Sequence, residues 1–121
     1  MTKVIEYRLP WPPSANRIWR AVAGRVILSA EGRAYAKKVS NALPAGPVVT
    51  FASRLRVTYW LYAPDSYGSR AWDIANREKV LSDALTKCGV WKDDSQIDGM
   101  QVLRAHRAGN GHVIVRIEEL E

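Results

Sequence analysis

The stretch of sequence that decides the fold is Arg54-Leu55-Arg56-Val57-Thr58-Tyr59-Trp60-Leu61-Tyr62-Ala63, followed after a loop by a helical pattern from about Asp73 to Cys88. In the first segment every second residue is apolar, and these residues are Leu55, Val57, Tyr59 and Leu61. Such alternation is typical of a half-buried strand. In the second segment one helical stripe contains Ile74, Arg77, Leu81, Leu85 and Cys88. The two segments predict a strand covered by a helix.

The remaining segments extend this pattern in both directions. Residues 3–9 alternate as a strand, Ser29 can cap a helix from about Ala30 to Leu43, and strands at roughly 97–105 and 112–119 flank a turn at residues 108–111. Residues 14–28 have no clean period, only a turn or short hairpin around Gly24. The order of elements predicts an α+β (mixed α/β) fold, one small β-sheet covered by two helices. We expect a single domain over residues 1–121.

The composition points to an anionic partner without requiring one. Eighteen Lys and Arg against twelve Asp and Glu give a formal charge of +6 and a pI near 9.8. The single cysteine, Cys88, has no partner for an intramolecular disulfide and is interpreted as a small buried residue. No apolar stretch is long enough for a membrane span or a signal peptide, so we expect a soluble, intracellular protein without a membrane partner.

Acidic side chains gather around the second helix of this basic chain. Asp73 stands at its start, and Asp93 and Asp94 follow its end. Mg²⁺ prefers oxygen ligands and keeps several waters, so one or two carboxylates beside a substrate phosphate can hold it. The helix separates its ends by about 1.5 Å per residue. The later loop must therefore fold back along the helix, or a strand must carry it back, before Asp73 and Asp94 can share an ion.

Each of these residues also has a structural interpretation. In this interpretation Asp73 caps the helix, and Asp93 and Asp94 are solvated turn residues. Lys79 can reach a phosphate or remain a surface lysine, and Glu78 projects from a different side and is expected to be exposed. The two histidines, His106 and His112, lack metal-ligand spacing and are expected at the surface. The sequence alone thus leaves metal-assisted cutting of a polyanion as a hypothesis.

A basic and aromatic stretch from Trp11 to Arg25 is typical of nucleic-acid binding. Its arginines can neutralise phosphates while aromatic rings stack on unpaired bases, although Trp11 is equally compatible with core packing. The candidate DNA contacts are Arg17, Arg20, Arg25, Lys37, Lys38, Arg70 and Asn76. These basic residues are chosen from charge and location only.

Four blocks of sequence carry the most specific motifs of the chain. In chain order they are Leu9-Pro10-Trp11-Pro12-Pro13-Ser14-Ala15-Asn16-Arg17, Ser29-Ala30-Glu31-Gly32-Arg33-Ala34-Tyr35, Asp73-Ile74-Ala75-Asn76 with Lys79, and Asp83-Ala84-Leu85-Thr86-Lys87-Cys88-Gly89-Val90-Trp91-Lys92-Asp93-Asp94. Together these blocks resemble the RusA family of Holliday-junction resolvases. The similarity covers nearly the whole chain. It implies a small homodimeric endonuclease that binds four-way DNA junctions and nicks two opposed strands with Mg²⁺, in DNA recombination and repair. Such proteins are typical of phages and prophages, which implies a bacterial cytoplasmic location.

The resemblance also implies which residues act. The family's pattern is Asp-x-Asp-Asn-x-x-Lys with a later Asp-Asp pair, so its catalytic acids map onto Asp73 and Asp94, which would also be metal ligands, and its catalytic lysine maps onto Lys79. Asp93 matches the first member of the later pair. Ala75 stands where the family has its second catalytic aspartate.

The alanine at position 75 predicts weak or absent cutting. Without this carboxylate, fewer negative charges hold Mg²⁺ and orient the attacking water. Alanine deletes only the carboxylate, so a deliberate substitution that traps DNA uncut is the preferred explanation, and a naturally inactive relative that only binds DNA is the other. The alternative function is a non-catalytic protein that binds branched or single-stranded DNA. A further rival is a basic phage scaffold or regulatory protein with no junction preference.

Overall fold

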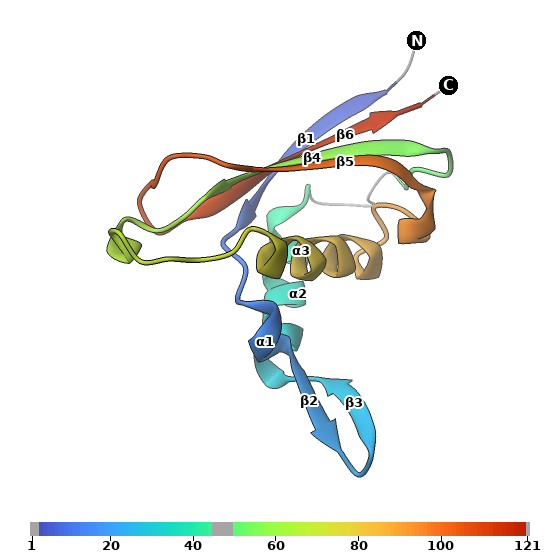
Figure 1. Ribbon diagram of the computed structural model, residues 1–121. Coiled ribbons are helices and arrows are strands. Elements are labelled where there is room, and N and C mark those ends of the chain that lie inside the picture. The colour runs from blue at the N-terminus through green and yellow to red at the C-terminus, as the bar shows by residue number, and fades with distance from the viewer. Residues whose placement is uncertain (1–2, 45–49, 121) are drawn as a thin grey trace.

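The computed structural model describes residues 3–44 and 50–120 and contains one four-stranded sheet and one separate two-stranded ribbon. The elements are β1 (Val4–Pro10), α1 (Ala15–Ile18), β2 (Trp19–Val22), β3 (Arg25–Leu28), α2 (Ala30–Ala42), β4 (Leu55–Tyr62), η1 (Asp65–Tyr67), α3 (Ala75–Lys87), η2 (Asp94–Gln96), β5 (Ile97–Arg104) and β6 (His112–Glu119). The sheet order is β1-β6-β4-β5. Figure 1 shows the ribbon of β2 and β3 projecting from the body.

The direction of the strands explains where α3 lies. β6 pairs antiparallel with β1 and with β4, whereas β4 and β5 are parallel. Parallel neighbours require a crossover connection, and η1, α3 and η2 provide it. In Figure 1, α2 and α3 lie on the same side of the sheet. The prediction of an α+β fold with a sheet covered by two helices is confirmed.

The end of β5 lies against the chain that enters α3. Nη2 of Arg104 donates to the carbonyl oxygen of Trp72 at 2.9 Å, and the Arg104 Cζ lies 4.0 Å from the Trp72 ring centroid. The start of the helical region therefore lies near the carboxyl end of β5. Ligands in sheets with parallel strands commonly bind outside the carboxyl ends of those strands.

The core fills the space between the sheet and the two helices. Its largest fully buried side chains include Trp91, Tyr59, Phe51, Leu81 and Leu85. The Tyr59 hydroxyl on β4 and the Ser82 hydroxyl on α3 form a hydrogen bond of 2.8 Å, and Ser82 donates to Glu78 at 2.7 Å. Buried polar groups need such partners, so this chain of contacts fixes α3 against the sheet.

No helix within residues 3–44 and 50–120 has the length and apolar character needed to cross a membrane.

Several local predictions need correction. Residues 14–28 contain the one-turn helix α1, which has no detectable period at four residues, and the hairpin predicted around Gly24 is present, with positive φ at Ala23 and Gly24. Thr58 was assigned to the polar face but is buried, because β5 and β6 flank it on both sides. Cys88 is only half-buried.

Gly111, in the connection from β5 to β6, offers a test of local packing. Its φ is +82°, and a Cβ there would lie 2.8 Å from Cδ and Cγ of Pro64. We expect Gly111→Ala to lower the free energy of unfolding by about 1–3 kcal/mol, through backbone strain and this overlap, measured by urea denaturation. Gly109→Ala is the matched control, because Gly109 also has positive φ (+49°) but open space around its Cβ. Equal losses in both variants would exclude the Pro64 contact as a cause.

Candidate active site

Asp73 precedes α3 without capping it. The helix begins at Ala75, its cap position is Ile74 in helical conformation, and no side chain makes a capping hydrogen bond there. The interpretation of Asp73 as a helix cap is therefore wrong. Its side chain is exposed, two residues before the first turn. The carboxylate thus remains accessible to a ligand at the start of the helix.

The loop after α3 folds back as far as Lys79, which lines a pocket with Asp94 but not with Asp73. The Lys79 Nζ lies 3.1 Å from Oδ1 of Asp83, one turn further along the helix, and 3.8 Å from Oδ2 of Asp94 on η2. The hydrogen bond with Asp83, followed by the charges of Asp83, Asp94 and Glu78, raises the pKa of Lys79 above its ordinary value. Lys79 is therefore a fixed cation at neutral pH, beside a carboxylate that is distant in sequence.

Asp93 has a structural role next to Asp94. Its backbone N–H donates to Oε1 of Gln96 at 3.0 Å, and its carboxylate accepts a hydrogen bond from Ser95. The Ser95 hydrogen bond lowers the pKa of Asp93. The Gln96 amide in turn donates to the carbonyl oxygens of Phe51 and Ser53. These contacts define the short turn that presents Asp94 to Lys79.

A pocket of about 340 Å³ lies between α3, η2 and the start of β5. The acidic side chains that line it are Glu78, Asp94 and Asp98. Glu78 is half-buried rather than exposed as predicted, because it accepts the hydrogen bond from Ser82, and Asp98 is paired with Arg54. Asp94, opposite Lys79, is the remaining carboxylate of this pocket.

Position 75 lies on the same helix face as Lys79. Ala75, Lys79 and Asp83 are spaced by four residues, and such residues follow one face of a helix. In the described ranges no group of three or more His, Cys, Asp or Glu side chains is arranged to hold a metal. Asp73 and Asp94 are oxygen donors of the kind that Mg²⁺ accepts. The donor set fits Mg²⁺ in kind, but Ala75 leaves it one carboxylate short of the pattern that the sequence resemblance implies.

The structure brings together three of the predicted DNA contacts. Arg17, Lys38 and Arg70 line a second pocket of about 340 Å³, between α2 and the loop before α3. Arg20 and Arg25 lie on the ribbon of β2 and β3 instead. Lys37 is exposed on α2 and does not line this pocket, and Asn76 is half-buried in the first turn of α3.

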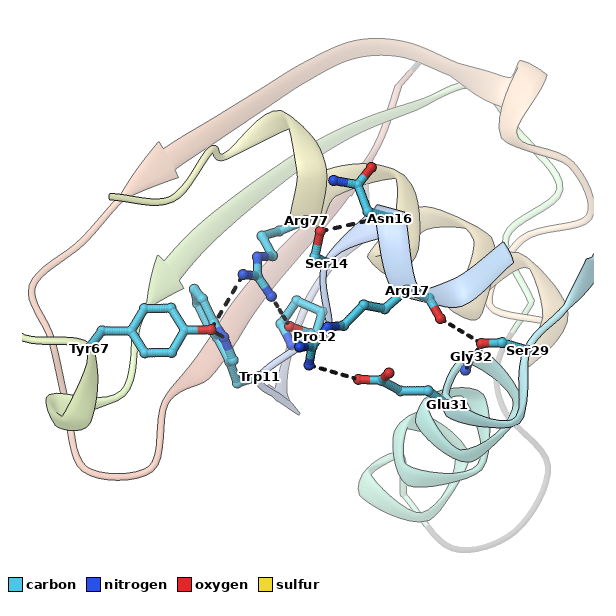
Figure 2. A network of polar contacts seen from close by, with 10 residues as sticks. All are labelled: Trp11, Pro12, Ser14, Asn16, Arg17, Ser29, Glu31, Gly32, Tyr67 and Arg77. Carbon is cyan, nitrogen blue, oxygen red and sulfur yellow. Dashed lines mark hydrogen bonds and ion pairs between the residues drawn. The ribbon is translucent and has the colours of Figure 1, made fainter. Parts of the chain in front are cut away.

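Arg77, at the base of this second pocket, is a residue whose role the sequence analysis missed (Figure 2). It is only 5% exposed, its Nη1 donates to the carbonyl oxygen of Pro12 at 2.6 Å, and its Nη2 donates to the Tyr67 hydroxyl at 3.3 Å. The Trp11 Nε1 donates to the same hydroxyl at 3.2 Å. Edge-on contacts with Tyr67 and Trp72 make Trp11 a packing residue. The signal in the sequence was an arginine within an apolar stripe.

Removing the Arg77 side chain should destabilise the protein. We expect Arg77→Ala to lower the free energy of unfolding by about 2–4 kcal/mol, because packing is lost and buried acceptors lose their donors. Arg33→Ala is the matched control, since the exposed Arg33 also donates to a backbone carbonyl, that of Leu28 at 2.7 Å. The Arg33→Ala variant should lose less than about 1 kcal/mol of the free energy of unfolding. Urea denaturation measures both, and similar losses would contradict the role assigned to burial.

Comparison with known proteins gives a consistent family. The model of the family described as "Endodeoxyribonuclease RusA" matches residues 10–118. "Crossover junction endodeoxyribonuclease rusA" of Enterobacteria phage 82 and "Crossover junction endodeoxyribonuclease RusA" of Escherichia coli strain K12 are each 34% identical over 113 residues, which cover 93% of this chain and 92% of the relative. The protein of Enterobacteria phage HK97, with the same description, is 34% identical over 117 residues, covering 96% and 95%. The predicted membership is confirmed, and the chain belongs to the RusA family of endodeoxyribonucleases.

Proposed function

We propose that this protein is a Holliday-junction resolvase that binds four-way DNA and whose cutting step is disabled by the alanine at position 75. The observation that carries this proposal is that the loop after α3 places Asp94 3.8 Å from the Lys79 ammonium. Lys79 itself lies on α3, the helix that begins at Ala75. The names of the relatives, crossover junction endodeoxyribonucleases, support the substrate class. The substrate class and the site thus rest on independent observations.

In this proposal Asp73 and Asp94 hold Mg²⁺, together with an aspartate at position 75 in the intact arrangement. When bound, such an ion lowers the pKa of a coordinated water and polarises the scissile phosphate. Lys79 keeps its proton and stabilises negative charge that develops on phosphate oxygens. Arg17, Lys38 and Arg70 neutralise neighbouring phosphates of the strand.

The assembly is part of the proposal. Residues 1–121 form one domain, which the family match over residues 10–118 supports. Two copies form a homodimer with one active site in each, so that two opposed strands are nicked as a pair. A two-fold dimer matches the approximate symmetry of a junction. Relatives from phages and enterobacteria support a bacterial cytoplasmic setting and a phage or prophage origin.

A second function is favoured by one specific observation. Ala75 removes a carboxylate from an otherwise preserved pattern, which suits a protein that binds branched or single-stranded DNA without cutting it. A basic scaffold or regulatory protein without junction preference is the third possibility.

Restoring the carboxylate tests the proposed chemistry. We expect Ala75→Asp to increase nicking of a labelled four-way junction in Mg²⁺ on the order of 100-fold or more, a size typical of a positioned electrostatic group. Ala75→Asn, with the same shape but no charge, should not. Strand-resolved products on denaturing gels measure the rate. If Ala75→Asp binds the junction as tightly as the parent but still does not nick it, the non-catalytic DNA-binding function is favoured. Equal affinity for junction and duplex at matched salt would overturn the resolvase assignment.

Lys79 offers a second test in the Ala75→Asp background. Lys79→Met should lower the nicking rate by about 100-fold with little change in junction affinity, because the ammonium acts on developing charge. Lys87→Met, an exposed lysine in the last turn of the same helix, is the control. Since the pKa of Lys79 is raised, loss of its proton should not limit the rate near neutral pH. An equal effect of both lysine variants would contradict a catalytic role for Lys79.

A further inference from the structure

Arginine side chains converge on a pocket of about 520 Å³ at the carboxyl ends of β4 and β5. The residues that matter here are Arg70, Trp72, Arg104, His106 and Arg107. Of the three arginines in this pocket, only Arg70 is among the DNA contacts predicted from the sequence, because Arg104 and Arg107 are distant from it along the chain. Their proximity follows from the parallel placement of β5 beside β4.

All three guanidinium groups are held by the loop that precedes α3. Arg104 stacks on Trp72 and donates to its carbonyl oxygen at 2.9 Å, and Arg70 stacks on Tyr67 with its Cζ 4.2 Å from the ring centroid. Nη1 of Arg107 lies 3.4 Å from the carbonyl oxygen of Asp65. A guanidinium has five N–H donors, so these contacts leave most of them unused. The groups are therefore oriented in advance but not saturated.

The three arginines of this pocket outnumber the single acidic side chain that lines it. Within the described ranges, Arg70, Arg104 and Arg107 form no ion pair with a carboxylate, whereas Arg54 and Arg56 are paired with Asp98 and Glu118. One acid, Asp65, also lines the pocket, and its carboxylate accepts a hydrogen bond from the backbone N–H of Gly109 at 3.1 Å. Three like charges around one pocket repel each other unless an anion lies among them. Planar guanidinium groups fit phosphate oxygens in particular.

The position of the pocket relates it to the candidate active site. Arg104 contacts the carbonyl of Trp72, which belongs to the peptide group that joins Trp72 to Asp73. Arg70 lines both this pocket and the one that contains Arg17 and Lys38. Basic side chains thus continue from α2, around the loop before α3, to the end of β5. A strand that meets Asp73 has phosphate partners on both sides of that loop.

We propose that this pocket binds the phosphate backbone of DNA beside the phosphate at Asp73, with Arg104 and Arg107 as its ligands. The inference rests on the proposed function, because it assumes that DNA reaches Asp73. A purely structural role is the competing explanation, in which Arg104 only braces the loop through Trp72. That role would change stability but not the salt dependence of DNA binding.

The chain with Ala75 suits a binding experiment, since DNA should remain uncut. A fluorescent four-way junction and a duplex of equal length are titrated over a salt series. For the double variant Arg104→Gln with Arg107→Gln we expect affinity for both DNAs to fall at least about 10-fold, and the slope of log K against log salt to become less steep by about 2, one for each lost phosphate contact. Phosphate contacts are independent of sequence, so both DNAs should respond.

The matched control is Arg56→Gln. It removes one positive charge, as each of the two pocket substitutions does, but Arg56 is exposed near the other end of β4 and paired with Glu118 at 3.6 Å. Its affinity and slope should equal those of the parent. A melting curve verifies folding of each variant. If the double variant is unfolded, Arg107→Gln alone, which keeps the stack of Arg104 on Trp72, must reduce the slope by about 1.

Each outcome decides between the inference and the function on which it rests. If the parent prefers the junction and the variants keep the parent's salt slope, the proposed DNA contact at this pocket is wrong and the proposed function stands. If the parent binds junction and duplex equally and the variants have a reduced salt slope, the resolvase function is wrong and the DNA contact at this pocket is supported. A parent that binds neither DNA overturns both.

Discussion

The parallel pairing of β4 with β5 is the constraint on which the site depends. An antiparallel pair needs only a tight turn, but a parallel pair requires the chain to return to the starting end of the sheet. Helix α3 makes this return, and the loop after it then passes alongside Lys79 before β5 begins. The same pairing places the end of β5 beside Trp72. Acidic and basic groups that are far apart in sequence therefore meet at one helix.

Arg77 connects this crossover to the amino-terminal segment. A buried cation is by itself weak evidence for stability, because desolvation opposes the gain from its contacts. Here Nη1 and Nη2 reach Pro12 and Tyr67, while Nε has no partner among the described residues. The geometry thus favours a role in holding three segments at defined positions over a role in maximising stability. The residue orders the loop that leads to Asp73.

Sequence predicted the elements with long, regular periods, but not the contacts between them. The alternation of apolar residues in β4 and the apolar stripe of α3 were sufficient to predict these two elements. The one-turn helix α1 is too short to show a period. The cap at Asp73 failed because Ile74 already has helical backbone angles. The meeting of Asp94 with Lys79 depends on the direction of β5, which spacing alone does not determine. The stack of Arg104 on Trp72 links residues 32 positions apart and leaves no local signal.

The ribbon of β2 and β3 has a mechanical consequence. It pairs only with itself and exposes Trp19, Val22 and Val26, so it has no core of its own. Its attachment is narrow: the Ser29 N–H donates to the carbonyl oxygen of Ile18 at 2.7 Å, and a Cβ at Gly32 would lie 2.8 Å from Leu28. The ribbon therefore extends from the body as an arm that carries Arg20 and Arg25 away from the sheet (Figure 1). The outer part of this arm depends on its own hydrogen bonds rather than on a packed core.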